Sequence, residues 1–200
     1  MFITWHGHSC IKIQSKDQVI VIDPYDQNIA PKPPIIKKAD AIIVTHPNLI
    51  DVSKFKESFV ISNPGEYEVK GSFVHGLPAG EQTIYFLEIE GVTMAHLANI
   101  KEDLTEKQKE VIEEVDVLFI PVGGHQTYDF KKASGMIQEI EPRVVIPMSF
   151  QFPGLKLPAD TADRFIKEEG IKDATPLDKV RIITKDLPAD ETNFYILKKQ

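Results

Sequence analysis

Short runs in which hydrophobic and polar residues alternate fill the first half of the chain, and this pattern is typical of half-buried β-strands. Residues 9–14 alternate in this way. Residues 41–45 form a continuous apolar run, which predicts a strand buried on both faces. The strands predicted in this half are residues 2–5, 9–14, 18–23, 41–45, 58–62, 66–71, 72–76, 83–90 and 92–97.

The second half alternates between helical and strand patterns. Thr105 and Gln108 have the spacing of a capping box and predict a helix that begins there. Residues 129–140 place apolar side chains on one face of a helix. A third helix is predicted after Asp160, which we expect to cap it, with Gly170 at its C-terminal end. Further strands are predicted at residues 116–122, 144–148, 180–184 and 193–197.

This order of elements predicts an α/β protein. No low-complexity linker divides the chain, so we expect a single domain over residues 1–200. Two mixed sheets packed face to face, with helices outside, would accommodate both halves. Periodicity alone does not select this arrangement over other α/β layouts.

Composition excludes several classes of protein. Hydrophobic residues make up 42% and charged residues 26%, as in ordinary globular proteins, and no stretch approaches the roughly 18 apolar residues of a membrane span. The first ten residues lack the pattern of a secretory signal. Cys10 is the only cysteine, which excludes a cysteine-rich zinc site. The formal charge of −7 disfavours general nucleic-acid binding. We therefore expect a cytoplasmic protein that binds neither membranes nor nucleic acids in general.

One segment carries a recognisable motif. Residues 42–51 read IIVTHPNLID, an apolar run that delivers Thr45 and His46 to a loop. The segment resembles the metal-binding motif T-H-x-H-x-D-H of the metallo-β-lactamase superfamily, in which these two residues match. Asn48, Ile50 and Asp51 stand where that motif has His, Asp and His.

Six further segments are similar to the small lactonase-like branch of this superfamily, and they occur in the same order along the chain. They read WHGHS (5–9), VIDPY (21–25), PGEYE (64–68), HLAN (96–99), IPVGG (120–124) and IPMS (146–149). The resemblance implies a four-layer αββα sandwich, in which two mixed sheets lie inside and the helices lie outside.

The resemblance also implies a two-metal site whose bridging hydroxide attacks an ester, lactone, amide or phosphodiester. Positions 46 and 48 and a histidine near 78–82 are implied for the first ion, and positions 50, 51 and 149 for the second, with 99 as the bridge. Residues 78–82 contain no histidine, and a catalytic zinc usually has three ligands, which Asn and Ser rarely provide. The residues at the implied positions are His46, Asn48, Ile50, Asp51, Asn99 and Ser149.

These replacements predict a protein that has lost its metal site, holds no cofactor, and acts as a non-catalytic binding or scaffolding protein for an unknown small molecule or protein. The alternative is a hydrolase with a rebuilt site, either metal-independent or with zinc or another divalent ion held around His46 and Asp51. A second alternative is a subunit that pairs with an active relative, so both homo- and hetero-oligomers are open.

Other polar residues are candidates for the pocket. We expect the implied ligand positions to converge at one end of the sandwich, with His8 at the rim and Asp23 bracing the loops. Asp51 is favoured as a helix N-cap. Glu66 is favoured as part of a solvated strand face. The full set of pocket or binding candidates is His8, Asp23, His46, Asp51, Glu66, His96 and His125.

Overall fold

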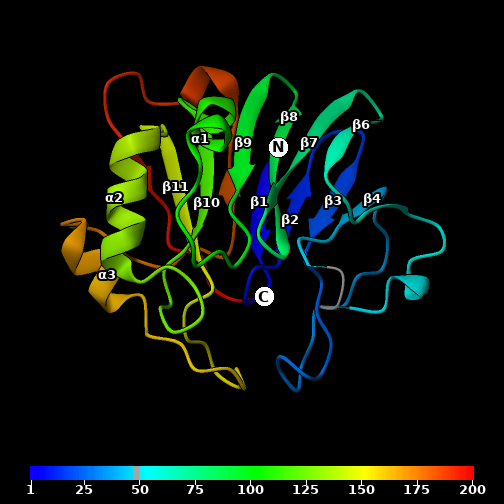
Figure 1. Ribbon diagram of the computed structural model, residues 1–200, viewed down its shortest axis with the longest axis horizontal. Helices are drawn as coiled ribbons and strands as arrows, with labels where there is room; N and C mark the ends of the chain where they lie inside the picture. Colours follow the sequence, from blue (N-terminus) through cyan, green and yellow to red (C-terminus); the bar gives the residue numbers. More distant parts are fainter. Residues whose placement is uncertain (47–49) are drawn as a thin grey trace.

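The computed structural model of the protein describes residues 1–46 and 50–200 and shows two β-sheets packed face to face (Figure 1). Sheet A contains β1 (Phe2–Trp5), β2 (Ile11–Gln14), β3 (Val19–Ile22), β4 (Ala41–Ile43), β5 (Phe59–Ile61) and β12 (Val180–Arg181). Sheet B contains β6 (Gly65–Val69), β7 (Ser72–Ala79), β8 (Gln82–Ile89), β9 (Val92–His96), β10 (Val117–Pro121), β11 (Val144–Met148) and β13 (Asn193–Phe194).

Both sheets are mixed, which confirms the predicted fold class. The strand order is β12–β1–β2–β3–β4–β5 in sheet A and β13–β11–β10–β9–β8–β7–β6 in sheet B. In sheet A the pairs from β12 to β3 are antiparallel, and the pairs β3–β4 and β4–β5 are parallel. In sheet B the pairs from β6 to β9 are antiparallel, and those from β9 to β13 are parallel.

The core lies between the two sheets. In β1 and β2, buried Ile3, Trp5, Ile11 and Ile13 alternate with more exposed residues, so the outer side of these strands contacts water. All residues of β10 and β11 are buried, because these strands lie between the core and a helix layer. The continuous apolar runs at 116–122 and 144–148 are explained by this double burial.

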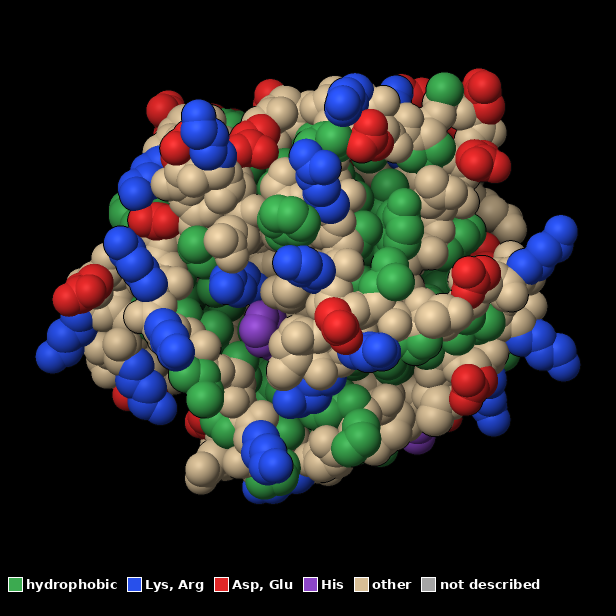
Figure 2. Space-filling view, turned by 180° about the vertical axis from the view of Figure 1, so that it is seen from behind, with side chains coloured by type: hydrophobic (Ala, Val, Ile, Leu, Met, Phe, Trp, Pro, Cys, Tyr) green, Lys and Arg blue, Asp and Glu red, His purple; other side chains and the backbone are tan. Residues whose placement is uncertain are grey.

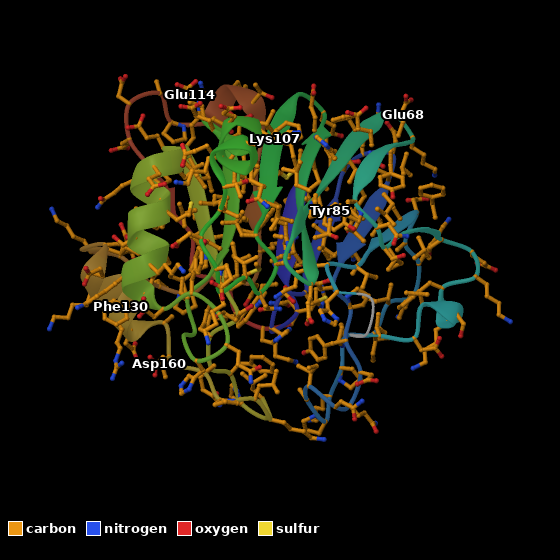
Figure 3. The ribbon with its side chains drawn as sticks, viewed as in Figure 1. Glu68, Tyr85, Lys107, Glu114, Phe130 and Asp160 are labelled. Atoms are coloured by element: carbon orange, nitrogen blue, oxygen red, sulfur yellow. The ribbon has the colours of Figure 1, made fainter. Side chains whose placement is uncertain are left out.

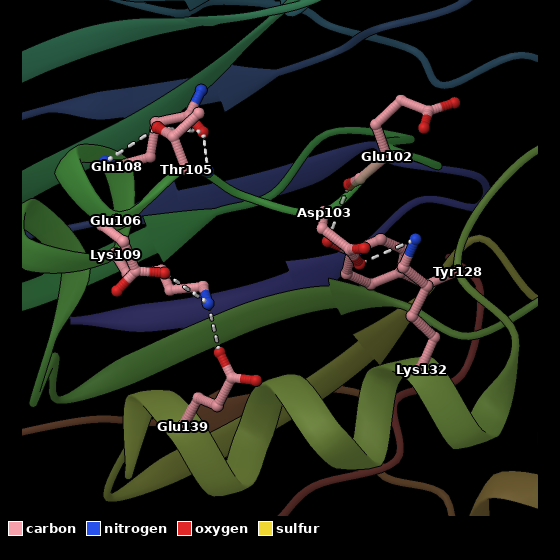
Figure 4. A network of polar contacts seen from close by, with 9 residues as sticks. All are labelled: Glu102, Asp103, Thr105, Glu106, Gln108, Lys109, Tyr128, Lys132 and Glu139. Atoms are coloured by element: carbon pink, nitrogen blue, oxygen red, sulfur yellow. Dashed lines mark hydrogen bonds and ion pairs between the residues drawn. The ribbon is translucent and has the colours of Figure 1, made fainter.

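Helices α1 (Glu106–Ile112) and α2 (Phe130–Ile140) cover one face of sheet B (Figure 1). They link β9 to β10 and β10 to β11, and right-handed crossovers between parallel strands place both on the same face. The predicted capping box between Thr105 and Gln108 is formed. At the surface, Lys109 Nζ lies 3.2 Å from Glu106 Oε1 and 2.7 Å from Glu139 Oε2, joining the two helices (Figure 4).

The C-terminal third departs from the prediction. Helix α3 (Asp163–Glu168) begins after Ala162, and Asp160 does not cap it. The Asp160 carboxylate instead accepts a hydrogen bond from Arg164 Nη1 at 3.2 Å. Predicted strand 180–184 is paired only over Val180–Arg181 and is followed by the short helix η2 (Thr184–Asp186). Predicted strand 193–197 is paired as β13 over two residues, because the chain then turns away to the single bridge Leu177–Leu197.

The surface charge is distributed unevenly. On the face opposite to that of Figure 1, lysine and arginine side chains are interspersed with apolar surface around the centre (Figure 2). Burial, together with the positive charges of Lys12 and Lys199, lowers the pKa of His6 to about 4.

Among the described residues, no helix combines the length and the apolar character that crossing a membrane requires.

Candidate active site

The carboxyl ends of six strands meet at one edge of the sandwich. In sheet A, β1, β3 and β4 run in the same direction, and in sheet B, β9, β10 and β11 are parallel. The backbone N–H of Ser149, after β11, donates to the His8 carbonyl, after β1, at 3.0 Å, so the two sets of ends are joined. We call this side the carboxyl edge. Ligands of α/β proteins commonly bind outside the carboxyl ends of strands.

Left-handed backbone conformations gather in the loops of the carboxyl edge. His8, Asp23, Ala98 and Ser149 have φ values of 51°, 48°, 54° and 58°. Each follows the end of its strand by one to three residues. Residues other than glycine rarely adopt this conformation, and such strain is concentrated at functional sites. Contacts with the rest of the fold must therefore offset the unfavourable backbone conformation of these four residues.

A cavity of about 160 Å³ opens at the carboxyl edge. His46, Asn99 and Ser149, which are far apart in sequence, line it together with His8. Sequence reasoning did not single out Gln82, Gln126 and Thr127, which also line it. Ile29, Leu155 and Leu157 add apolar surface. The pocket thus combines imidazole, amide and hydroxyl groups with an apolar wall, as small-molecule sites usually do.

Asp23 braces the strand that carries His46. Its carboxylate is 1% exposed and accepts two hydrogen bonds from Thr45, from the backbone N–H at 2.7 Å and from the hydroxyl at 2.6 Å. The described residues include no lysine or arginine that forms an ion pair with Asp23. The interpretation of Asp23 as a brace for the loops agrees with these contacts.

Sheet B supports the same strand from the other side. Tyr85, which lies in the interior of the molecule (Figure 3), donates from its hydroxyl to the Val44 carbonyl at 3.2 Å. The Thr83 N–H donates to the Thr45 carbonyl at 2.7 Å. Both residues belong to β8, so this strand and Asp23 together set the position at which His46 leaves sheet A.

The segment at 78–82, which has no histidine, is a tight hairpin with another role. Pro78 and Ala79 end β7, and Gln82 begins β8. The Gln82 side chain accepts from the Asn99 N–H at 2.9 Å and donates to the Asn99 carbonyl at 2.8 Å. This two-point contact holds the backbone of Asn99 beside the cavity.

Side chains from three loops form a continuous hydrogen-bonded series at the pocket. Ser149 Oγ donates to Asn99 Oδ1 at 2.6 Å, and Asn99 Nδ2 donates to Ser9 Oγ at 2.9 Å. Ser9 Oγ lies 3.1 Å from His8 Nδ1. We call these residues the Ser149–His8 series. Burial lowers the pKa of His8 to about 4, so its imidazole is neutral at physiological pH.

Gly123 allows the loop after β11 to approach. A Cβ atom at position 123 would lie 2.0 Å from the Ser149 carbonyl oxygen, so only glycine fits there. The Asp160 N–H donates to the Gly123 carbonyl at 2.7 Å and holds the next loop in place. Gly123 therefore serves loop packing, and Gly124 lines the cavity.

His96 is a structural residue beneath the pocket. It is fully buried, its Nδ1 accepts from the Ala98 N–H at 3.2 Å, and its Nε2 lies 2.9 Å from the Ser9 carbonyl. These partners define the tautomer, because Nε2 must carry the proton that Ser9 accepts. Cys10 is also buried, and burial raises the pKa of its thiol, so it is not a nucleophile.

Three further candidates lie away from the cavity lining. Asp51 is the N-cap of the short helix η1 (Val52–Lys54), and its carboxylate accepts from the Ser53 N–H at 3.0 Å. His125 Nε2 lies 3.9 Å from Asp160 Oδ1 and is not part of the lining. Glu66 is in β6, and Glu68 of the same strand lies at the opposite edge of the molecule from Asp160 (Figure 3). Ile50 is half-buried, and Asn48 lies outside the described residues.

The donors at the implied ligand positions do not fit the two-metal site of the resemblance. Asn99 Oδ1, at the bridging position, already accepts from the Ser149 hydroxyl, and Asp51 faces Ser53. Residues 1–46 and 50–200 contain no cluster of three or more His, Cys, Asp or Glu side chains suited to an ion. A catalytic zinc usually has three protein ligands, so no chemical step is assigned to a metal here.

The chain belongs to the metallo-β-lactamase superfamily, because residues 2–149 match the family model for the β-lactamase superfamily domain. A crystal structure of a Thermotoga maritima protein, provisionally assigned to the Zn-dependent hydrolases of this superfamily, is similar over 98% of both chains, with 28% identity and a TM-score of 0.82. A UPF0173 metal-dependent hydrolase from Pyrococcus abyssi is 25% identical over 72% of this chain and 82% of its own. Another from Lysinibacillus sphaericus is 26% identical over 78% and 88%.

These relatives contradict two of the expectations. A non-catalytic protein with a lost metal site, and the absence of a cofactor, were predicted from the residues at six inherited positions. The Pyrococcus and Lysinibacillus relatives, which match most of the chain, are named as metal-dependent hydrolases, and the Thermotoga protein is provisionally assigned to Zn-dependent ones. Both predictions are therefore wrong, and the alternative of a hydrolase with a rebuilt site is favoured.

Proposed function

We propose that the protein is a metal-dependent hydrolase of esters, lactones or phosphodiesters, and that its substrate binds in the cavity at the carboxyl edge. The observation that carries this proposal is the similarity to the Thermotoga protein over 98% of both chains. The cavity supports it, because His46, Asn99 and Ser149 all line one space at the edge where strands deliver their loops.

The described side chains have clear supporting tasks in such a reaction. Asp23 and Tyr85 hold the strand that presents His46, and Gln82 holds Asn99. The apolar wall formed by Leu155 and Leu157 would bury a non-polar part of the substrate. His46 keeps the histidine of the inherited motif and is the described residue that would contact a metal ion.

Metal binding and hydrolysis test the proposal together. Protein purified without a histidine tag is stripped and titrated with Zn²⁺ and Mn²⁺ by calorimetry. We expect about one ion per chain, with affinity at least tenfold lower in His46→Ala. His75→Ala is the matched control, because His75 lies in β7 outside the cavity lining, and it should bind as the parent does.

The same proteins are then tested with a panel of p-nitrophenyl esters, lactones and bis-p-nitrophenyl phosphate. We expect metal-stimulated hydrolysis of at least one class, and its loss in His46→Ala. Hydrolysis that is unaffected by chelation would replace the proposal with a metal-independent hydrolase. Neither binding nor turnover under any condition would overturn it.

A further inference from the structure

The hydrogen bonds of Asn99 have a direction that extends to His8. An amide side chain offers one acceptor oxygen and one donor nitrogen, so reversing it would exchange the roles of its two partners. The contact of Asn99 with Ser149 Oγ is 2.6 Å, which suits an O–H···O bond, and its contact with Ser9 Oγ is 2.9 Å, which suits N–H···O. The two lengths therefore agree with the oxygen toward Ser149 and the nitrogen toward Ser9.

This direction determines what Ser9 offers to His8. The Ser9 hydroxyl oxygen accepts the hydrogen of Asn99 Nδ2, so its own hydrogen points elsewhere. Within the described residues, its other side-chain partner is His8 Nδ1 at 3.1 Å. The Ser9 hydroxyl is fully buried and has no other hydrogen-bond acceptor among the described residues, so we assign its hydrogen to His8 Nδ1, which is then the unprotonated nitrogen. In a neutral imidazole the proton then resides on Nε2.

The Nε2–H group of His8 is placed to donate a hydrogen bond into the cavity. Its ring lines the cavity, and Nε2 makes no hydrogen bond to any described residue. The His8 backbone is fixed, since its carbonyl accepts from Trp5 Nε1 at 2.7 Å and from the Ser149 N–H at 3.0 Å, and the ring itself contacts Ser9 Oγ and the Tyr25 ring. Burial keeps the pKa of His8 near 4, so the ring remains a neutral donor across the pH range in which hydrolases usually work.

We propose that Asn99, acting through Ser9, holds His8 in the Nε2–H tautomer, so that His8 donates a hydrogen bond to the carbonyl or phosphoryl oxygen of a substrate in the cavity. This role for His8 rests on the proposed hydrolase function, whereas the tautomer does not. Asn99 and Ser9 are positioning residues. His8 stabilises negative charge on the substrate oxygen without transferring a proton, as a neutral imidazole donor can.

The tautomer is measured directly by ¹⁵N NMR of the imidazoles in the full-length protein at pH 7, with His8 assigned by comparison with His8→Gln. We expect a pyrrole-type Nε2 and a pyridine-type Nδ1. A protonated Nδ1 with a bare Nε2 in the parent protein would overturn the proposal.

Asn99→Asp tests the cause. A carboxylate only accepts, so it would take hydrogen bonds from both Ser149 and Ser9. The Ser9 oxygen is then free to accept from His8, and we expect Nδ1 to gain a proton. Asn63→Asp makes the same chemical change at an exposed loop residue and should leave the His8 signals unchanged. If Nδ1 of His8 stayed unprotonated in Asn99→Asp, Asn99 would not determine the tautomer of His8.

Ser9→Ala provides a second test should Asn99→Asp not fold. Without the hydroxyl, nothing in the Ser149–His8 series holds Nδ1 unprotonated, and we expect the two tautomers of His8 to exchange. A fully retained Nε2–H tautomer would show that Asn99 and Ser9 do not determine it.

The catalytic part is tested by two substitutions of similar size. His8→Gln retains an N–H donor and His8→Met does not, so we expect kcat to fall by less than about tenfold in the first and about 10²–10³-fold in the second. Equal losses of kcat in the two variants would show that His8 does not act as a hydrogen-bond donor to the substrate. A correct tautomer in a protein without hydrolytic activity would instead count against the proposed function alone.

Discussion

Two polar regions of the molecule differ in what surrounds them. At the carboxyl edge, Asp23 and the Ser149–His8 series are largely enclosed and are hydrogen-bonded to specific partners. Between α1 and α2, Lys109 pairs with Glu106 and Glu139, whose side chains are 86% and 52% exposed (Figure 4). Water reaches both glutamates in the second region, whereas the Asp23 carboxylate in the first region is 1% exposed. The number of polar contacts is therefore a poor guide to their energetic weight.

The largest effect is expected where the carboxyl edge is most tightly packed. Gly123→Ala would force a Cβ to within 2.0 Å of the Ser149 carbonyl, so the loop after β11 must move. We expect a loss of more than about 4 kcal/mol in the free energy of unfolding, measured by urea denaturation. Gly135→Ala is the control, because no atom lies within 4 Å of its added Cβ in α2, and it should stabilise by about 0.5–1 kcal/mol. Similar losses in both would refute the packing explanation.

Removing the buried brace should have the next largest effect. Asp23→Ala leaves the Thr45 N–H and hydroxyl without their acceptor, and we expect destabilisation by about 2–4 kcal/mol in chemical denaturation. Asp23→Asn should lose less, since it keeps one acceptor oxygen and asparagine tolerates the left-handed conformation. Equal losses would show that charge, rather than hydrogen bonding, matters at this position.

Acid should weaken the protein through its buried histidines. The pKa values of His6 and His8 are lowered to about 4 from 6.5, mainly by burial. Between these values the unfolded chain binds protons that the folded chain does not, so stability is complete above pH 6.5 and falls as the pH drops toward 4. We expect His8 to contribute about 2–3 kcal/mol of this loss. Thermal melts from pH 7 to pH 4 measure this loss. If stability fell with pH equally steeply in His8→Gln and in the parent, His8 would not be its source.

The smallest effect is expected in the exposed network. Lys109→Ala removes two ion pairs between partners that water reaches, and we expect a change below about 0.5 kcal/mol. The measurement is urea denaturation at low and at high salt, and the small difference should shrink further at high salt. A loss comparable with that of Asp23→Ala would abolish the contrast between the two regions.

Local patterns predicted most of the fold. The capping box at Thr105 and Gln108, the helix over 129–140 and the continuous apolar runs of β10 and β11 depend on neighbouring residues, and all were confirmed. Two-residue strands β12 and β13 depend on partners far along the chain, so their short pairing could not be predicted from sequence. The same limit explains why Asp160 was misassigned as a cap.

The candidate site was predictable only in part. The family resemblance predicted that His46, Asn99 and Ser149 would converge, and all three line one cavity. The role of Gln82 was hidden, since its contact with Asn99 spans the β8–β9 hairpin. The predicted loss of catalysis rested on the inherited positions alone, and relatives named as metal-dependent hydrolases contradict it.

The fluorescence of Trp5 can report on changes at the carboxyl edge. It is the only tryptophan in the chain, its indole N–H donates to the His8 carbonyl at 2.7 Å, and its ring centroid lies 4.4 Å from that of Phe150. A ligand that shifts His8 would alter this hydrogen bond and so the wavelength of indole emission. Intrinsic fluorescence, excited at the red edge where tyrosine does not absorb, can therefore screen compound libraries against the unlabelled protein before any substrate has been found.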